Sequence, residues 1–335
     1  MPSIPKITQY FKLARDYKAS DILLCAGSVP ALKIRGDIHF LQGAPALTGD
    51  NTEEYLLQIV NDAQKERFEA TMDLDFSYHD AEFGRYRVNA FLNKDGVGII
   101  FRPISETVPE IETLGLPKIV SEFPHYKNGL VVVTGTVGSG KSTTLASVMQ
   151  VINRSEQKHI ITIEDPIEFV FRNDKSIINQ REVYDNTQNF HMALRASLRE
   201  APDVLLVGEM RDPETVSLAV EAAETGILVF ATLHTSGAAK AVDRMIDMFD
   251  SAQQNQIRSS LSVSLRAVVW QELLKTKDGQ GRVPACEVLV GNSEVASMIR
   301  KNVTHQIPSA METGMADGMV TMDQSMEKLK AEGRI

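Results

Sequence analysis

The first hundred positions show two patterns of hydrophobic and polar residues, an alternating pattern and a helical spacing. Residues 85–92 read Arg-Tyr-Arg-Val-Asn-Ala-Phe-Leu, and this alternation is typical of a strand with one buried face. Residues 7–17 and 52–69 instead carry apolar residues at helical spacing, which predicts two helices. Short apolar runs bounded by turn residues predict four more strands, at 22–24, 31–34, 73–79 and 97–103. The pattern therefore predicts a small α+β domain with an antiparallel sheet over residues 1–103.

A second pattern begins at residue 129, where the apolar runs become continuous. Four of these runs predict strands, at residues 130–133, 159–163, 204–207 and 228–232, with helical patterns between them. Continuous apolar strands are typical of a parallel sheet that is covered on both faces. Asp212 and Pro213 predict the start of one helix, and an apolar stripe over residues 252–274 predicts a longer helix. We therefore expect an α/β domain over residues 119–335.

The stretch between the two patterns has few core residues. Residues 104–118 follow Pro103 directly and contain Pro109, Pro117 and several acids. Prolines stiffen a chain and interrupt regular structure, so this stretch is predicted to be a linker.

A glycine-rich loop follows the predicted strand at 130–133. Residues 135–142 read Gly-Thr-Val-Gly-Ser-Gly-Lys-Ser, the pattern of a phosphate-binding loop, and a helical stretch comes next. A strand, a glycine loop and a helix wrap backbone N–H groups around a phosphate. Lys141 is expected to reach the β- and γ-phosphates of ATP, and Ser142 to hold Mg²⁺. The predicted nucleotide-binding residues are Gly135, Gly138, Ser139, Gly140, Lys141, Ser142 and Thr143.

Ionisable residues follow three of the other predicted strands. In an open parallel sheet, ligands bind beyond the carboxyl ends of the strands, so these residues are candidates for the same site. Glu209 is predicted to hold Mg²⁺ through a water, and Glu164 or Glu168 to act on the attacking water as a base. His234 is a candidate γ-phosphate sensor or interface residue, and an ordinary structural role remains the alternative.

Composition narrows the classes of function. The chain has 335 residues and a formal net charge of −9, with no basic run of the kind that tracks nucleic acid. Its two cysteines, Cys25 and Cys286, are far apart, which indicates a reducing compartment. No apolar run approaches the roughly 20 residues of a membrane span, so we expect a cytoplasmic protein that meets a membrane only through partners.

Taken together, these stretches resemble the secretion-type ATPases of type IV pili, specifically the pilus-retraction ATPases. The resemblance covers nearly the whole chain, because short stretches of the first domain match as well. The matching stretches are residues 135–144 (Walker A), 161–170 (Asp box), 179–183, 198–200, 203–212 (Walker B), 222–235 (His box), and 19–21 and 84–91 in the first domain.

This resemblance implies a fold and a function. The fold would be an N-terminal PAS-like α+β domain followed by a RecA-like P-loop ATPase domain with a mainly parallel sheet. The function would be that of a homohexameric motor at the inner membrane, which hydrolyses ATP to drive pilus retraction and twitching motility. Its partners would be the inner-membrane platform protein of the pilus and other pilus ATPases.

The resemblance also implies a site shared between subunits, because arginines of the N-terminal domain complete the ATP site in this family. Arg85, Arg87 and Arg102 occupy the matching stretches. Arg85 and Arg87 alternate with Tyr86 and Val88, so both are expected on one face of a strand.

One departure supports an alternative. The retraction motif near the C-terminus of the family is present only as Val-Ala-Ser-Met-Ile-Arg-Lys at residues 295–301. The chain could therefore be an accessory subunit of the PilU type, which binds ATP, hydrolyses it weakly and modulates another pilus ATPase.

Overall fold

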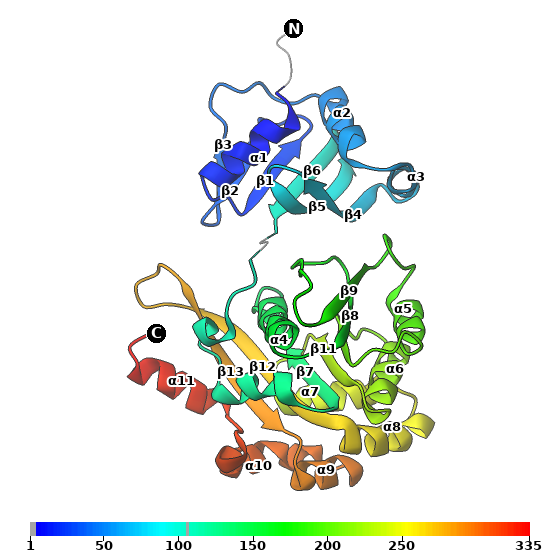
Figure 1. Cartoon of the computed structure of the whole chain (residues 1–335). Helices are drawn as coiled ribbons and strands as arrows, with labels where there is room; N and C mark the ends of the chain where they lie inside the picture. Colours follow the sequence, from blue (N-terminus) through cyan, green and yellow to red (C-terminus); the bar gives the residue numbers. More distant parts are fainter. Residues whose placement is uncertain (1–4, 105–106) are drawn as a thin grey trace. The chain divides into compact units, whose positions relative to one another are not determined.

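The computed structural model describes residues 5–104 and 107–335. The chain divides into two compact units, Met1–Thr107 and Val108–Ile335 (Figure 1). Each unit has its own sheet and its own hydrophobic core. No helix within the described residues is both long enough and apolar enough to cross a membrane.

The first unit contains a six-stranded sheet in the order β3-β2-β1-β6-β5-β4. Every pair of neighbouring strands is antiparallel, as predicted. The elements are α1 (Ile7–Asp16), β1 (Asp21–Cys25), β2 (Ala31–Ile34), β3 (Asp37–Phe40), α2 (Gly49–Ile59), α3 (Asp62–Thr71), β4 (Asp73–Asp80), β5 (Gly84–Asn93) and β6 (Gly96–Pro103).

One face of this sheet forms the core with α1 and α2. Phe11 of α1 stacks on Tyr86 of β5 with ring centroids 4.3 Å apart. Tyr86 and Val88 are buried while Arg85 and Arg87 are half-buried, so the predicted alternation of this strand is confirmed. Arg87 lies opposite Arg102 of β6, which places these arginines on the face that points away from α1 and α2.

The prediction of a single helix at residues 52–69 is wrong, because two helices cover this stretch. The chain leaves the helical conformation at Val60 (φ −103°, ψ 147°), and Asn61 then caps a second helix, α3, through a reciprocal pair of hydrogen bonds with Gln64. Asparagine favours such caps because its side-chain oxygen satisfies a free N–H of the first turn. Strand β3 was not predicted either, because Gly36 and Asp37 indicated only a turn.

The second unit contains a seven-stranded sheet in the order β13-β12-β7-β11-β10-β8-β9 (Figure 1). All neighbouring pairs are parallel except β12 and β13, so the predicted mainly parallel sheet is confirmed. The strands are β7 (Gly129–Thr134), β8 (His159–Glu164), β9 (Ile177–Glu182), β10 (Val204–Val207), β11 (Leu228–Leu233), β12 (Leu265–Lys275) and β13 (Arg282–Val290).

Helices cover both faces of this sheet. Apolar residues of α4 pack against one face together with the 3₁₀ helices η1 and η2, while residues of α5 to α10 pack against the other. The helical elements are η1 (Ile111–Leu114), η2 (Lys118–His125), α4 (Lys141–Ser155), α5 (Phe190–Ser197), α6 (Pro213–Glu224), α7 (Ala238–Asp247), α8 (Ser251–Ser264), α9 (Ser293–Arg300), η3 (Thr304–Gln306), α10 (Ile307–Thr313), η4 (Gly314–Asp317) and α11 (Met322–Ala331).

The helix predicted over residues 252–274 is correct only as far as Ser264. From Leu265 the chain forms β12, which lies between β13 and β7 in the sheet. Leu265 and Val268 matched the helical stripe, but the adjacent Ala267 and Val269 are also fully buried, as a strand covered on both faces requires. Periodicity alone does not separate these two readings of a short apolar run.

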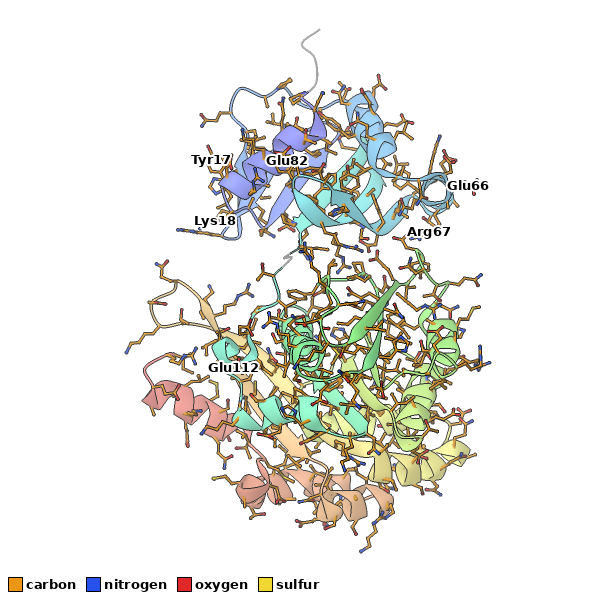
Figure 2. All side chains as sticks on the ribbon, in the orientation of Figure 1. Tyr17, Lys18, Glu66, Arg67, Glu82 and Glu112 are labelled. Carbon is orange, nitrogen blue, oxygen red and sulfur yellow. The ribbon has the colours of Figure 1, made fainter. Side chains whose placement is uncertain are left out.

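Most of the predicted linker packs on the second unit. Ser147 of α4 donates a hydrogen bond to the carbonyl oxygen of Pro109 (2.7 Å), and Arg154 pairs with Glu110 (2.6 Å). Ile111 is buried, and Glu112, labelled in Figure 2, lies in the same short helix η1. The chain therefore divides into its two units after residue 107, and residues 105–106 of the predicted linker lie outside the described part of the chain.

Candidate nucleotide-binding and catalytic site

The glycine loop joins the end of β7 to the start of α4. Three of its glycines have positive φ angles that other residues rarely adopt: Gly135 (146°), Gly138 (77°) and Gly140 (89°). Gly140 is the N-cap of α4 and has no side chain with which to cap it. The first N–H groups of α4 therefore point out of the helix end, where an anion can accept from them.

The loop also carries a buried hydroxyl group that lacks a partner. Ser139 Oγ has no hydrogen-bond partner within residues 5–104 and 107–335, although Ser139 is only 3% exposed. Beside it, a Cβ atom added to Gly138 would meet nothing within 4 Å. Buried polar atoms in proteins are nearly always paired, so the unpaired hydroxyl in this loop indicates a partner that the described residues do not supply.

Lys141 is folded back onto the loop. Its ammonium group donates to the carbonyl oxygens of Gly135 (2.8 Å) and Thr136 (2.9 Å). Burial lowers the pKa of Lys141, while the charges of Glu209 and Glu168 act in the opposite direction. The lysine thus lies within electrostatic reach of two of the predicted acids. Ser142 and Thr143 follow it in the first turn of α4 and are both partly exposed.

Glu209 and His234 come together at the carboxyl ends of neighbouring strands. His234 Nε2 lies 3.3 Å from Glu209 Oε1, and Arg211 Nη2 lies 2.8 Å from Glu209 Oε2. Burial alone would raise the pKa of the Glu209 carboxyl, but Arg211 and His234 hold it below its ordinary value. Glu209 is therefore a carboxylate at neutral pH.

The pKa of Glu164 is shifted in the opposite direction, above its ordinary value. Its Oε1 atom accepts from Thr162 Oγ1 (2.6 Å) and from Gln180 Nε2 (3.2 Å). Burial nevertheless raises the pKa of Glu164 to about 7, and the nearby charge of Glu168 adds to this effect. A group with a pKa near the working pH is suited to accept and return a proton.

The three predicted arginines belong to the first unit. Arg102 pairs with the nearly buried carboxylate of Asp21, with both Nε and Nη2 at 2.9 Å from Oδ1. Arg85 Nη2 donates to Ser77 Oγ at 2.6 Å, and Arg87 lies opposite Ser77 on β4. All of these contacts lie on one face of the sheet in the first unit. The role of the arginines at the ATP site of a neighbouring subunit stays a prediction.

Sequence reasoning missed three residues that organise this site. Gln271 of β12 hydrogen-bonds the phosphate loop, Gln180 of β9 holds Glu164, and Arg211 pairs with Glu209. Arg211 stands two positions after Glu209 in the sequence, and this short separation could have indicated that the two side chains form an ion pair. Gln180 lies in residues 179–183, which match the family, but no role was assigned to it. Gln271 lies in a segment that was predicted to be helical, so no local pattern pointed to it.

A mainly parallel sheet with a phosphate loop after one strand, and acids at the ends of two other parallel strands, defines a P-loop nucleotide-binding protein. Within this class, residues 101–329 match the family described as type II/IV secretion system protein, and the chain belongs to this family.

Several relatives are similar over most of their length. A twitching motility protein of Neisseria gonorrhoeae is 47% identical over 91% of this chain and 82% of its own. The type IV pilus retraction ATPase PilT of Pseudomonas aeruginosa is 44% identical over 98% of this chain and 95% of its own. The type IV pilus ATPase PilU of the same organism is 38% identical over 94% of this chain and 82% of its own.

A solved structure shows the same fold. The crystal structure of the pilus retraction motor PilT with bound ADP superposes with a TM-score of 0.92 at 44% identity, over 99% of this chain and 95% of that one. The resemblance to pilus-retraction ATPases and the fold class expected from sequence are thereby confirmed. Two of these relatives are described as ATPases, and the solved relative holds ADP.

Proposed function

We propose that this chain is an ATP-hydrolysing motor of the type IV pilus machinery that drives pilus retraction and twitching motility. The observation that carries the proposal is the phosphate loop with its buried, unpartnered Ser139 hydroxyl, in one unit with the acids Glu164 and Glu209. The similarity to a pilus retraction ATPase along 98% of the chain supports it.

In this proposal, ATP is the substrate and is held by the loop. Backbone N–H groups at the start of α4 bind the β-phosphate, and the Ser139 hydroxyl donates to a phosphate oxygen. Lys141 exchanges its carbonyl partners for the β- and γ-phosphates, where its charge offsets theirs. Gly135, Gly138 and Gly140 let the backbone approach closely enough for these contacts.

The hydroxyl of Ser142 and the carboxylate of Glu209 fit Mg²⁺, which prefers oxygen ligands. When bound, the ion would neutralise charge that develops on the phosphates. Glu209 suits this position because its carboxyl group is ionised, and His234 beside it suits a sensor of the γ-phosphate.

Glu164 suits the role of general base. Its carboxylate would take a proton from the attacking water and return it after the phosphate has left. Glu168 would support this step, because its charge helps to keep the pKa of Glu164 high. The hydrogen bonds from Thr162 and Gln180 to one oxygen fix the orientation of the carboxylate.

We further propose a homohexamer in which the first unit of one subunit completes the site of the next. Arg85 and Arg87 lie on one sheet face and would supply the cations that phosphoryl transfer recruits, worth roughly 10³–10⁵ in rate. Arg102 is the weaker candidate, because it holds Asp21, whose side chain is 8% exposed. The hexamer would act at the inner membrane through the platform protein of the pilus and other pilus ATPases.

Mixing two inactive variants tests the shared site. Arg85→Ala/Arg87→Ala and Lys141→Ala are expected to be inactive separately and to regain part of the ATPase activity when they are mixed. Some interfaces in a mixed ring then pair an intact arginine set with an intact Lys141. Lys94→Ala, which changes an 89% exposed side chain in the same unit, is the control. Mixed rings that form but stay inactive at every ratio contradict the shared site.

The accessory role is the second candidate. The segment that replaces the retraction motif lies at α9, where Val295 and Ile299 are buried and Arg300 is exposed. A motor hydrolyses ATP in steady state by itself, whereas an accessory subunit binds ATP but gains turnover only with another pilus ATPase. Steady-state ATPase assays of the purified chain, with Lys141→Ala as the inactive reference, separate the two.

A further inference from the structure

Gln271 connects the phosphate loop to the middle of the β12–β13 hairpin. Its Nε2 atom donates to the carbonyl oxygen of Ser139 (2.8 Å), and its Oε1 atom accepts from Thr144 Oγ1 (2.8 Å). Gln271 and Thr144 are only 3% and 1% exposed. One buried amide group thus ties β12 both to the loop and to the first turns of α4.

The loop is also shaped around this residue. A Cβ atom at Gly135 would overlap the backbone oxygen of Gln271, and one at Gly140 would lie 2.7 Å from its Nε2 atom. Two of the glycines that give the loop its conformation are therefore also required by the proximity of Gln271. The side-chain amide leaves no room for the loop to shift toward β12 without breaking these contacts.

The connection continues from Gln271 to the C-terminal helix α11. Gln271 lies directly opposite Cys286 in the β12–β13 pair. The backbone N–H of Cys286 donates to Ser325 Oγ of α11 at 2.9 Å. Leu329 of α11 packs against Val283 and Ala285 of β13, so α11 rests on this strand by apolar contact as well.

We propose that Gln271 is a positioning residue of the ATP site that couples nucleotide binding at the phosphate loop to the C-terminal helix α11. This inference rests on the proposed function, because it takes the loop to be the nucleotide site. A ligand that fixes the loop fixes Ser139 and Thr144, and through Gln271 it restrains β12 and the facing Cys286. The restraint then reaches Ser325 and lowers the rate at which α11 opens.

The test uses the full chain and ADP as the nucleotide. Gln271→Met keeps the length of the side chain and removes both hydrogen bonds, so we expect the Kd for ADP to rise about tenfold. Gln271→Glu keeps the acceptor for Thr144 but places a carboxylate next to Ser139 O, so it is expected to bind ADP no better than the methionine variant. Either variant binding ADP with wild-type affinity overturns the positioning role.

Hydrogen exchange of residues 322–331 measures the coupling. In the wild type, saturating ADP is expected to slow exchange in α11 severalfold. Gln271→Met at saturating ADP is expected to lose this response. Ser325→Ala, which leaves the loop contacts intact, is expected to reduce it without changing the Kd for ADP. Ser309→Ala, at an exposed position of α10, is the matched control and is expected to keep the full response.

Two outcomes overturn the coupling. The first is wild-type exchange in α11 that ADP does not change, and the second is a full response in either Gln271→Met or Ser325→Ala. Ser325→Ala keeps the test decisive if the Gln271 variants do not fold. A wild-type chain that binds ADP without slowing α11 refutes only this inference, whereas a chain that binds no nucleotide refutes the proposed function.

Discussion

The raised pKa of Glu164 makes a quantitative prediction for the variant Glu164→Gln. In the folded protein the pKa is about 7, against an ordinary value of 4.5. Between these two pH values the folded state binds more protons than the unfolded state, so stability falls as pH rises. Above pH 7 the carboxyl group is charged, and the net cost of holding this charge in the folded state is fully present. Because a pKa difference of one unit between the folded and unfolded states corresponds to about 1.36 kcal/mol, this cost is about 3 kcal/mol.

Glutamine is neutral at every pH and has nearly the same shape. The free energy of unfolding of Glu164→Gln, relative to wild type, is therefore expected to rise by up to about 3 kcal/mol between pH 5 and pH 8. Urea unfolding without nucleotide at both pH values measures it. The fluorescence of Trp270, the only tryptophan of the chain, reports on the second unit. Glu221→Gln, an exposed carboxylate on α6, is the control and is expected to show no such rise.

The same variant tests the chemistry. If Glu164 accepts the proton of the attacking water, Glu164→Gln binds ATP normally and hydrolyses it about 10²–10⁴-fold more slowly. Wild-type activity is expected to decline as pH falls below about 7, because the carboxyl group is then protonated. Equal pH dependences of stability in the two proteins would refute the desolvation argument. Unchanged turnover would refute the assignment of the base.

Three further changes give distinct results. Lys141→Ala is expected to abolish hydrolysis and to weaken ATP binding, because it removes the charge that faces the phosphates; undiminished turnover would exclude this site. Glu209→Gln is expected to keep ATP bound but to slow turnover, since an amide holds Mg²⁺ poorly, and a loss of ATP binding would indicate a structural role instead. Asp212→Ala removes the side chain that accepts from Thr215 N at 2.8 Å at the start of α6, so it is expected to cost about 1 kcal/mol in thermal unfolding, whereas Asp212→Asn keeps the cap.

The sequence predicted those parts of the site that local chemistry determines. A phosphate-binding loop can be recognised from sequence as a glycine-rich stretch between a strand and a helix. Glycine is required because the loop adopts positive φ angles, and the helix start supplies the N–H groups that bind the phosphate. Glu164, Glu209 and His234 were found because each directly follows an apolar run, and such runs become parallel strands with a shared carboxyl edge. These inferences require only the order of residues along the chain.

The remaining parts depend on contacts between distant positions. Gln271 reaches Ser139 because β12 lies beside β7, yet the apolar residues of β12 also fit a helical stripe. The raised pKa of Glu164 depends on how deeply its carboxyl group is buried and on Gln180 from the edge strand β9. Neither burial nor register can be read from a window of neighbouring residues. The sequence therefore identified Glu164 as a candidate but did not predict that its pKa is raised.

The order of strands in the sheet explains how the acids and the loop form one site. Between β7 and β8 the sheet places β11 and then β10, so His234 and Glu209 stand between the loop and Glu164. Parallel register aligns the ends of these strands: Ala231 lies opposite both Val132 and Val207, and Val207 opposite Ile163. A slip of one residue in any pair would turn each side chain of that strand to the other face. The buried side chains on the two faces of the sheet oppose such a slip, so the packing of the core fixes the spacing of the candidate catalytic groups.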